Sequence, residues 1–134
     1  MKQLIQIKIL AAILLLNGCQ TTLPSISEQN SDQIILTAEK AAETAKLTFS
    51  TLVHLERDNE AMLKTVNPQI HVYANTIRAH GIDWIVSLRD ATKTFKANRT
   101  QDNRASLNTI LATLLAAIGD TNKLIAQSKS AVGH

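Results

Sequence analysis

The stretch "NPQIHVYANTIRAHGIDWIVSLRDATKTFKAN", residues 67–98, decides the fold class that this sequence predicts. Asn67 is a favourable N-cap, and Pro68 stands in the first helical position, where its missing N–H costs nothing. The period that follows alternates steps of three and four residues, which indicates an α-helix with one apolar face over about 68–97. The residues on this face are Ile70, Ala74, Ile77, Gly81, Trp84, Leu88, Ala91 and Phe95.

The segments on either side of this stretch have the same period. A first helix is predicted over about 32–66 and a third over about 101–130, where Thr100 is the N-cap and Asp102 lies near the positive helix end. The apolar face of the first helix comprises Ile35, Ala38, Ala42, Ala45, Phe49, Leu52, Leu63 and Val66, and that of the third comprises Leu107, Leu111, Leu114, Ile118 and Ile125.

Three long helices with very short connections favour an all-α, antiparallel up-down-up three-helix bundle. Polar Glu56 and Asn59 interrupt the apolar face of the first helix, which we nevertheless expect to be continuous. Gly81 and Gly119 lie inside the second and third helices. Close backbone approach at a helix crossing is the expected reason for these glycines, and a kink is the alternative.

The start of the chain has a different character. Lys2 and Lys8 precede an apolar run at residues 9–16, which is too short for the roughly 20 apolar residues of a membrane-spanning helix. This pattern is typical of a secretory signal peptide. The one cysteine of the chain, Cys19, comes almost directly after the run, so no disulfide can form within the chain.

Residues Leu16, Asn17, Gly18 and Cys19 resemble the lipobox of bacterial lipoproteins. The resemblance implies cleavage before Cys19, acylation of this residue and membrane attachment through its acyl chains. Gln20 stands where an aspartate would retain such a protein at the inner membrane, so the resemblance implies the periplasmic face of the outer membrane.

The predicted organisation follows from these two parts of the chain. Residues 1–18 are a lipoprotein signal peptide, residues 19–31 are the lipidated cysteine and a flexible tether, and residues 32–134 are the helical bundle. The formal net charge of +3 falls to about +1 once Lys2 and Lys8 leave with the signal peptide. This charge balance argues against a nucleic-acid partner.

Two clusters are candidate sites. Folding the first two helices about Asn67 places opposite each other residues whose numbers sum to roughly 134, so His54 faces His80. With Asp58 and Asp83, one turn from each, these histidines offer four ligands for a divalent transition metal, and two solvated histidines are the alternative. The second cluster is basic and comprises Arg89, Lys93, Lys96, Arg99 and Arg104.

The basic cluster surrounds the break at 98–100, and a chain tethered at its start brings this break back toward the bilayer. Asp90 and Asp102 are the only acids close to it in sequence. We therefore expect a membrane-proximal basic tip attracted to anionic headgroups, with a solvated charged loop as the alternative.

Motifs for phosphate binding, nucleophilic catalysis and zinc binding are not found in the sequence, so we predict no enzyme activity and no cofactor. The predicted function is a non-catalytic interaction or assembly module, similar to a secretin pilotin or another envelope accessory protein, with an envelope protein as its partner. One alternative is a phage- or plasmid-encoded exclusion or lysis lipoprotein. A second is an envelope protein that binds a ligand or metal.

Replacing the predicted lipidation site tests the anchor. Cys19→Ser should abolish metabolic labelling with palmitate, because only the thiol of this residue can accept the lipid. Unchanged labelling and membrane retention of the variant would contradict the prediction.

Overall fold

The computed structural model describes residues 30–133, and all of its regular structure is helical. The helices are α2 (Ser31–Asp58), α3 (Glu60–Val66), α4 (Pro68–Ala97) and α5 (Gln101–Val132). The predicted all-α class is confirmed for this part of the chain. The predicted signal peptide, lipobox and Cys19 lie outside the described residues.

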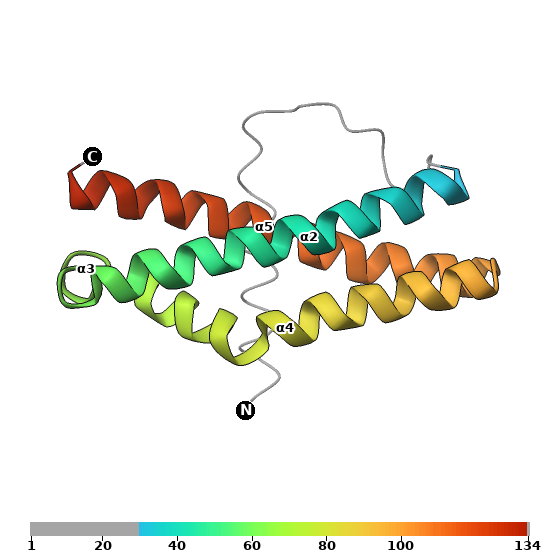
Figure 1. Ribbon diagram of the computed structural model, residues 1–134, viewed down its shortest axis with the longest axis horizontal. Coiled ribbons are helices and arrows are strands. Elements are labelled where there is room, and N and C mark those ends of the chain that lie inside the picture. Colours follow the sequence, from blue (N-terminus) through green and yellow to red (C-terminus); the bar gives the residue numbers. More distant parts are fainter. Residues whose placement is uncertain (1–29, 134) are drawn as a thin grey trace.

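The three long helices lie along one another. Figure 1 shows α2 running in one direction, α4 returning beside it and α5 running in the direction of α2. Each of these helices contacts the other two. The short helix α3 is seen end-on in Figure 1, across the end of the assembly where α2 leads into α4. The start of α2 therefore lies at the opposite end, where α4 leads into α5 and Arg99 pairs with Asp32 at 2.8 Å.

The prediction of one continuous helix over about 32–66 is wrong, because the helix is interrupted at Asn59. The side-chain amide of Asn59 donates to the carbonyl of Leu55 at 2.9 Å, which is the acceptor that its own backbone N–H would use in a continuous helix. The backbone N–H of Asn59 bonds instead to the carbonyl of Glu56 at 3.2 Å. Helix α3 then continues in a new direction, which leaves Val66 61% exposed although it was predicted in the core.

The other helix ends agree with the sequence in position. Pro68 is the first residue of α4, and the hydroxyl of Thr100 caps α5 by accepting from the backbone N–H of Asn103 at 3.2 Å. The side chain of Asn67 does not cap α4, since it donates to Gln127 of α5. The first helix begins at Ser31, within the predicted tether, because Asn30 forms a capping box with Gln33.

The core follows the predicted apolar faces closely. The buried apolar side chains come from all four helices: Ile34, Ile35, Ala38, Ala41, Ala42, Ala45, Phe49, Leu52, Leu63, Ile70, Ala74, Ile77, Ile85, Leu88, Phe95, Leu107, Leu111, Leu114 and Ile118. Trp84, Ala91 and Ile125 are only partly buried and pack against this core. The ring of Trp84 meets that of Phe49 edge-on, with centroids 5.9 Å apart.

Helix α5 is also the most apolar of the long helices. By length and composition alone it would suffice to cross a membrane. In the structure it packs along α2 and α4 and buries Leu107, Leu111 and Leu114 against them. Only 22% of its most apolar window is buried, so the core of the helical assembly accounts for part of its apolar residues.

The two helix-interior glycines differ in their surroundings. A Cβ atom on Gly81 would lie 3.2 Å from Cδ2 of Phe49 and 3.2 Å from Cγ2 of Ile77, so the close approach expected there is to side chains. A Cβ atom on Gly119 would meet nothing within 4 Å. The expected close approach at Gly119 is therefore wrong.

Alanine substitutions should separate these two glycines. Gly119→Ala should raise the free energy of unfolding by about 0.5–1 kcal/mol, because alanine has the higher helix propensity and meets no neighbour. Gly81→Ala should gain less or be destabilising, because Phe49 must move to admit the methyl group. Urea unfolding followed by circular dichroism measures both, and equal gains would contradict the packing at Gly81.

Candidate functional site

A buried carboxylate lies where α2 approaches α3 and α4. The side chain of Glu56 is only 1% exposed, because it occupies the inward face of α2, seven residues after Phe49 and four after Leu52. Its Oε1 accepts a hydrogen bond from Nδ1 of His71 at 2.5 Å, and its Oε2 accepts one from Nη2 of Arg78. Both carboxylate oxygens are thus bonded to side chains of α4.

A fourth side chain closes this arrangement into a ring. Nη1 of Arg78 donates to Oδ1 of Asn75 at 2.6 Å, and Nδ2 of Asn75 lies 3.2 Å from Nε2 of His71. An arginine has no acceptor, so Oδ1 of Asn75 must face it and the amide nitrogen must face His71. Nε2 of His71 therefore accepts, and the N–H at its Nδ1 donates to Oε1 of Glu56.

Helix geometry explains why α4 supplies three members of the ring. His71, Asn75 and Arg78 are spaced by four and three residues, so they lie on one face of α4. That face borders α2, beside the buried face formed by Ile70, Ala74 and Ile77. We call Glu56, His71, Asn75 and Arg78 the Glu56 ring.

The ring keeps Glu56 ionised. Burial by itself raises the pKa of the carboxyl group, but the hydrogen bonds from His71 and Arg78, together with the positive charge of Arg78, outweigh it and lower the pKa below its ordinary value of 4.5. The contribution of this group to stability is therefore complete at neutral pH. It is lost as the pH falls below 4.5 through the folded-state pKa.

A second carboxylate lies beside the ring. Glu60, in the first turn of α3, pairs with Lys64 at 2.6 Å, and both side chains are about half exposed. One ligand atom each from Glu56, Glu60 and His71 lie within 4.8 Å of one another. Glu60 follows Glu56 by four residues, a spacing that places two side chains side by side, and α4 brings His71 to both of them.

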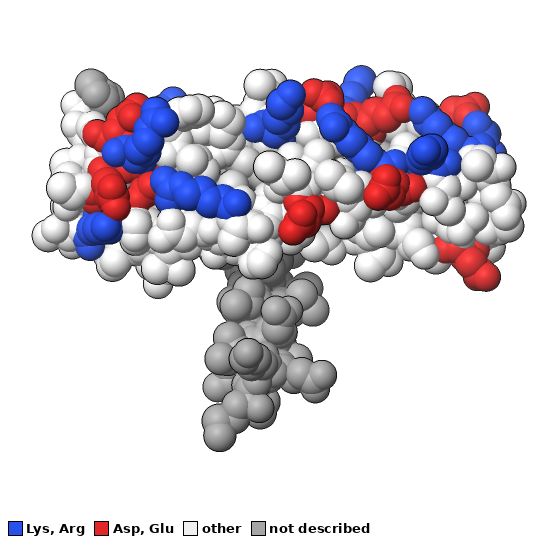
Figure 2. Space-filling view, turned by 60° about the horizontal axis from the view of Figure 1, so that its bottom comes forward, with Lys and Arg blue, Asp and Glu red and all other residues white. Residues whose placement is uncertain are grey.

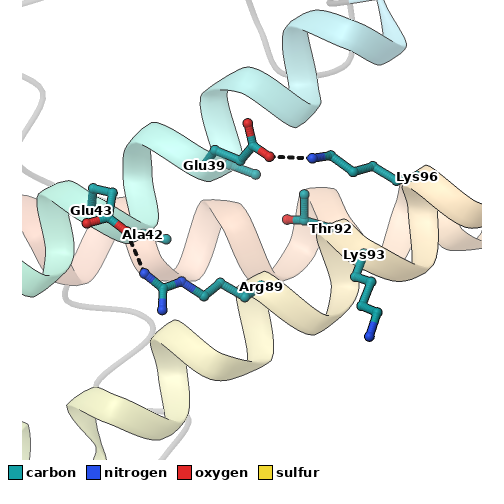
Figure 3. Close-up of a pocket in the computed structure, with 8 residues that line it drawn as sticks. Glu39, Ala42, Glu43, Arg89, Thr92, Lys93 and Lys96 are labelled. Atoms are coloured by element: carbon teal, nitrogen blue, oxygen red, sulfur yellow. Dashed lines mark hydrogen bonds and ion pairs between the residues drawn. The ribbon is translucent and has the colours of Figure 1, made fainter.

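Farther along the molecule, a shallow groove of about 440 Å³ runs between α2 and α4 (Figure 3). Its walls carry the ion pairs Arg89–Glu43, at 2.5 Å, and Lys96–Glu39. Figure 3 shows the amine of Lys93 pointing away from α2. The full lining is Ala38, Glu39, Ala42, Glu43, Arg89, Thr92, Lys93 and Lys96.

These ion pairs correct the charge of the predicted basic cluster. Arg89 and Lys96 are neutralised by acids of α2, and Arg99 pairs with Asp32 at 2.8 Å. Asp90 and Asp102 are the only acids close to the cluster in sequence, but the prediction that no other acid lies near it is wrong, because three acids of α2 contact it in the folded protein. The basic cluster is therefore much less positive than its sequence suggests.

The predicted metal ligands are not brought together. Nδ1 of His54 lies 2.8 Å from the carbonyl of Ser50 in its own helix, and His80 stacks on Trp84 with centroids 6.3 Å apart. Asp58 pairs with Arg57 next to it. Among residues 30–133, the group of three or more ligand atoms that lie close together is the one around Glu56, and neither His54, Asp58, His80 nor Asp83 belongs to it.

No family model, curated protein or solved structure matches this chain. Its candidate sites therefore have to be interpreted from their own geometry.

Sequence reasoning missed the Glu56 ring, although two signals were present. Glu56 continues the three-and-four spacing of an apolar face, where an acid has to find a partner on burial. Arg78 lies opposite it by the rule that residue numbers in the first two helices sum to roughly 134. Applying this rule to the acid on the inward face would have identified the pair.

Removing the charge of Glu56 tests the strength of the ring. Glu56→Gln should lower the free energy of unfolding by about 2–4 kcal/mol, because an amide cannot accept from both His71 and Arg78 and leaves one of them without its acceptor. The matched control Glu43→Gln removes an exposed ion pair and should cost less than about 1 kcal/mol. Urea unfolding at neutral pH compares them, and equal losses would contradict the ring as a stabilising network.

Proposed function

We propose that this protein is a lipid-anchored, non-catalytic interaction module at the periplasmic face of a bacterial outer membrane. In this proposal Cys19 carries the acyl chains, the residues that follow it form the tether, and the helices form an antiparallel up-down-up three-helix bundle to which α3 is added. The bundle binds an envelope protein through the face on which α2 and α4 meet. The lipobox resemblance supports the anchor, and an apolar surface supports the binding face.

The observation that carries the proposal is a set of large apolar side chains exposed on α2 and α4. Leu47 of α2 is 69% exposed, and Ile82 and Val86 of α4 are 75% and 46% exposed. Leu36 of α2 and Val72 of α4 are also more than half exposed. Exposed apolar side chains mark protein-binding surfaces when they gather on one face.

Helix geometry places the central members of this set on the same face. Leu47 follows Glu43 by one turn, and Ile82 precedes Arg89 by two turns, so each lies on the side of its helix where Glu43 and Arg89 pair. Phe49 of α2 lies against Gly81 of α4, which puts Leu47 and Ile82 at a similar level along the molecule. We call Leu47, Ile82 and Val86 the α2–α4 apolar patch.

The charges around this patch suit binding rather than catalysis. Figure 2 shows acidic and basic side chains interleaved on this side of the molecule, with uncharged surface between them. The ion pairs that line the nearby groove use their charged groups on each other. An apolar patch with a rim of paired charges is the usual composition of a protein–protein interface.

The proposed anchor also gives the molecule a direction. The tether precedes the start of α2, which lies at the same end of the molecule as the connection between α4 and α5. This end therefore lies nearest the membrane, and α3 with the Glu56 ring lies at the far end, about 45 Å away along a helix of 30 residues. The α2–α4 apolar patch lies between the two ends, accessible to a partner in the periplasm.

Site-specific photo-crosslinking in producing cells tests the binding face. A photoreactive amino acid at Leu47 or Ile82 should give a discrete adduct with a partner protein, because both side chains project from the proposed interface. The matched control is Thr113, an exposed position on α5. Val86→Asp should weaken the adduct formed from Ile82, because it places a charge in the patch.

Two outcomes would contradict the proposed face. One is the same adducts from Thr113 as from Leu47 and Ile82, and the other is no adduct from either patch position while the protein is correctly localised. Circular dichroism of each variant ensures that the comparison is made between folded proteins.

A further inference from the structure

We infer that Glu56, Glu60 and His71 form a binding site for a divalent transition metal, with Zn²⁺ as the best-fitting ion. The three side chains come from three different helices and present one ligand atom each within 4.8 Å of one another. No other group of this kind occurs among residues 30–133. The inference is independent of the proposed binding face, which lies elsewhere on α2 and α4.

The ligand types select the class of ion. One imidazole nitrogen and two carboxylate oxygens suit Zn²⁺ and its neighbours in the first transition row, whereas Mg²⁺ and Ca²⁺ prefer oxygen ligands alone. Three protein ligands leave room for water in the remaining position, as in open zinc sites. Glu56 supplies a carboxylate that is already ionised and held in place.

The distances require only small movements. Ligands at about 2.0–2.2 Å from zinc lie roughly 3.4 Å from one another in a tetrahedral site. The contact of 2.5 Å between Oε1 of Glu56 and Nδ1 of His71 therefore opens by about 1 Å. The carboxylate of Glu60 already lies within 4.8 Å of both ligand atoms and has to approach them by roughly 1 Å. Glu60 is about half exposed, so its side chain is free to rotate.

The ring provides the surrounding support that such a site needs. Arg78 holds Oε2 of Glu56, which leaves Oε1 for the metal. On binding, the proton of His71 moves from Nδ1 to Nε2, so that Nδ1 can donate its electron pair to the ion. Nε2 then donates to water, because the His71 side chain is about a quarter exposed and the oxygen of Asn75 stays bonded to Arg78. A histidine ligand whose second nitrogen donates to a carboxylate, a carbonyl or water is the common arrangement at protein metal sites.

The burial of Glu56 is an independent observation in favour of a ligand. A buried ion pair is often no more stabilising than apolar side chains of similar volume, because both charges lose their hydration. Position 56 lies on the apolar face of α2, where leucine would pack without a partner. A carboxylate that lies close to the imidazole of His71 and the carboxylate of Glu60 can bind a metal ion with them, which a leucine at this position could not.

The competing interaction is weak. Lys64 bonds Glu60 across an exposed (i, i+4) pair, which contributes little to stability because water screens both charges. A metal ion that binds Glu60 displaces Lys64 into solvent at little cost. Removing Lys64 should therefore favour the metal, which gives the site a variant that gains affinity.

Isothermal titration calorimetry of the full chain in detergent with Zn²⁺ tests the site. Wild-type protein should bind one equivalent, and Glu60→Gln should weaken binding by more than the roughly 10- to 100-fold that follows the loss of an outer-shell partner, because it removes a ligand. His71→Gln should have an effect at least as large. Lys64→Gln should tighten binding, because it frees the carboxylate of Glu60. The visible spectrum of Co²⁺ in the same protein should change on binding and lose this change in Glu60→Gln.

The matched control is His54→Gln, which removes an exposed histidine of α2 outside the cluster and should leave the titration unchanged. Glu60→Gln preserves the Glu56 ring, so its result does not depend on whether His71→Gln folds. Absence of stoichiometric Zn²⁺ binding, or equal binding by wild type and Glu60→Gln, would overturn the inference. Loss of binding in His54→Gln would overturn it as well, by placing the metal elsewhere.

Discussion

The interaction on which the rest of this structure depends is the buried carboxylate of Glu56 bonded to Arg78 and His71. An ionised carboxylate without partners is too costly to bury, so α4 must present its donors at this point of α2. This requirement sets how far α4 is displaced along α2 and how it is rotated about its own axis. Apolar side chains alone tolerate neighbouring registers far better, because hydrophobic contact has no direction.

The break at Asn59 depends on the same region. A side-chain amide takes the carbonyl of Leu55, the first helix ends, and α3 turns across the end of the molecule. In α3, Leu63 is buried, and Glu60, four residues after Glu56, lies close to His71. One asparagine thus ends α2 and separates α3 from it as a helix of its own.

The outer surface of α2 and α4 changes in character along their length, from paired charges near the α4–α5 connection to exposed apolar side chains farther along. Toward the α4–α5 connection, acids of α2 pair with bases of α4 and of the segment after it, as in Glu43–Arg89 and Asp32–Arg99. Between this region and the Glu56 ring, Leu47, Ile82 and Val86 are exposed. Pairing across helices neutralises a surface that looks basic in sequence, and it leaves the apolar patch as the more distinctive feature.

The sequence by itself determined the all-α class, the position of Pro68 in the first turn of its helix, the cap at Thr100 and nearly all of the core, because periodicity and capping are local properties. It also indicated the pairing of α2 with α4, where residue numbers sum to roughly 134. Only the tertiary structure decided that, of the pairs this register places opposite each other, Glu56 and Arg78 are in contact while His54 and His80 have other neighbours. The reason is rotation: opposite positions meet only when both side chains lie on the facing sides of their helices, and the bonds of Glu56 to α4, together with the packing of the core, set that rotation.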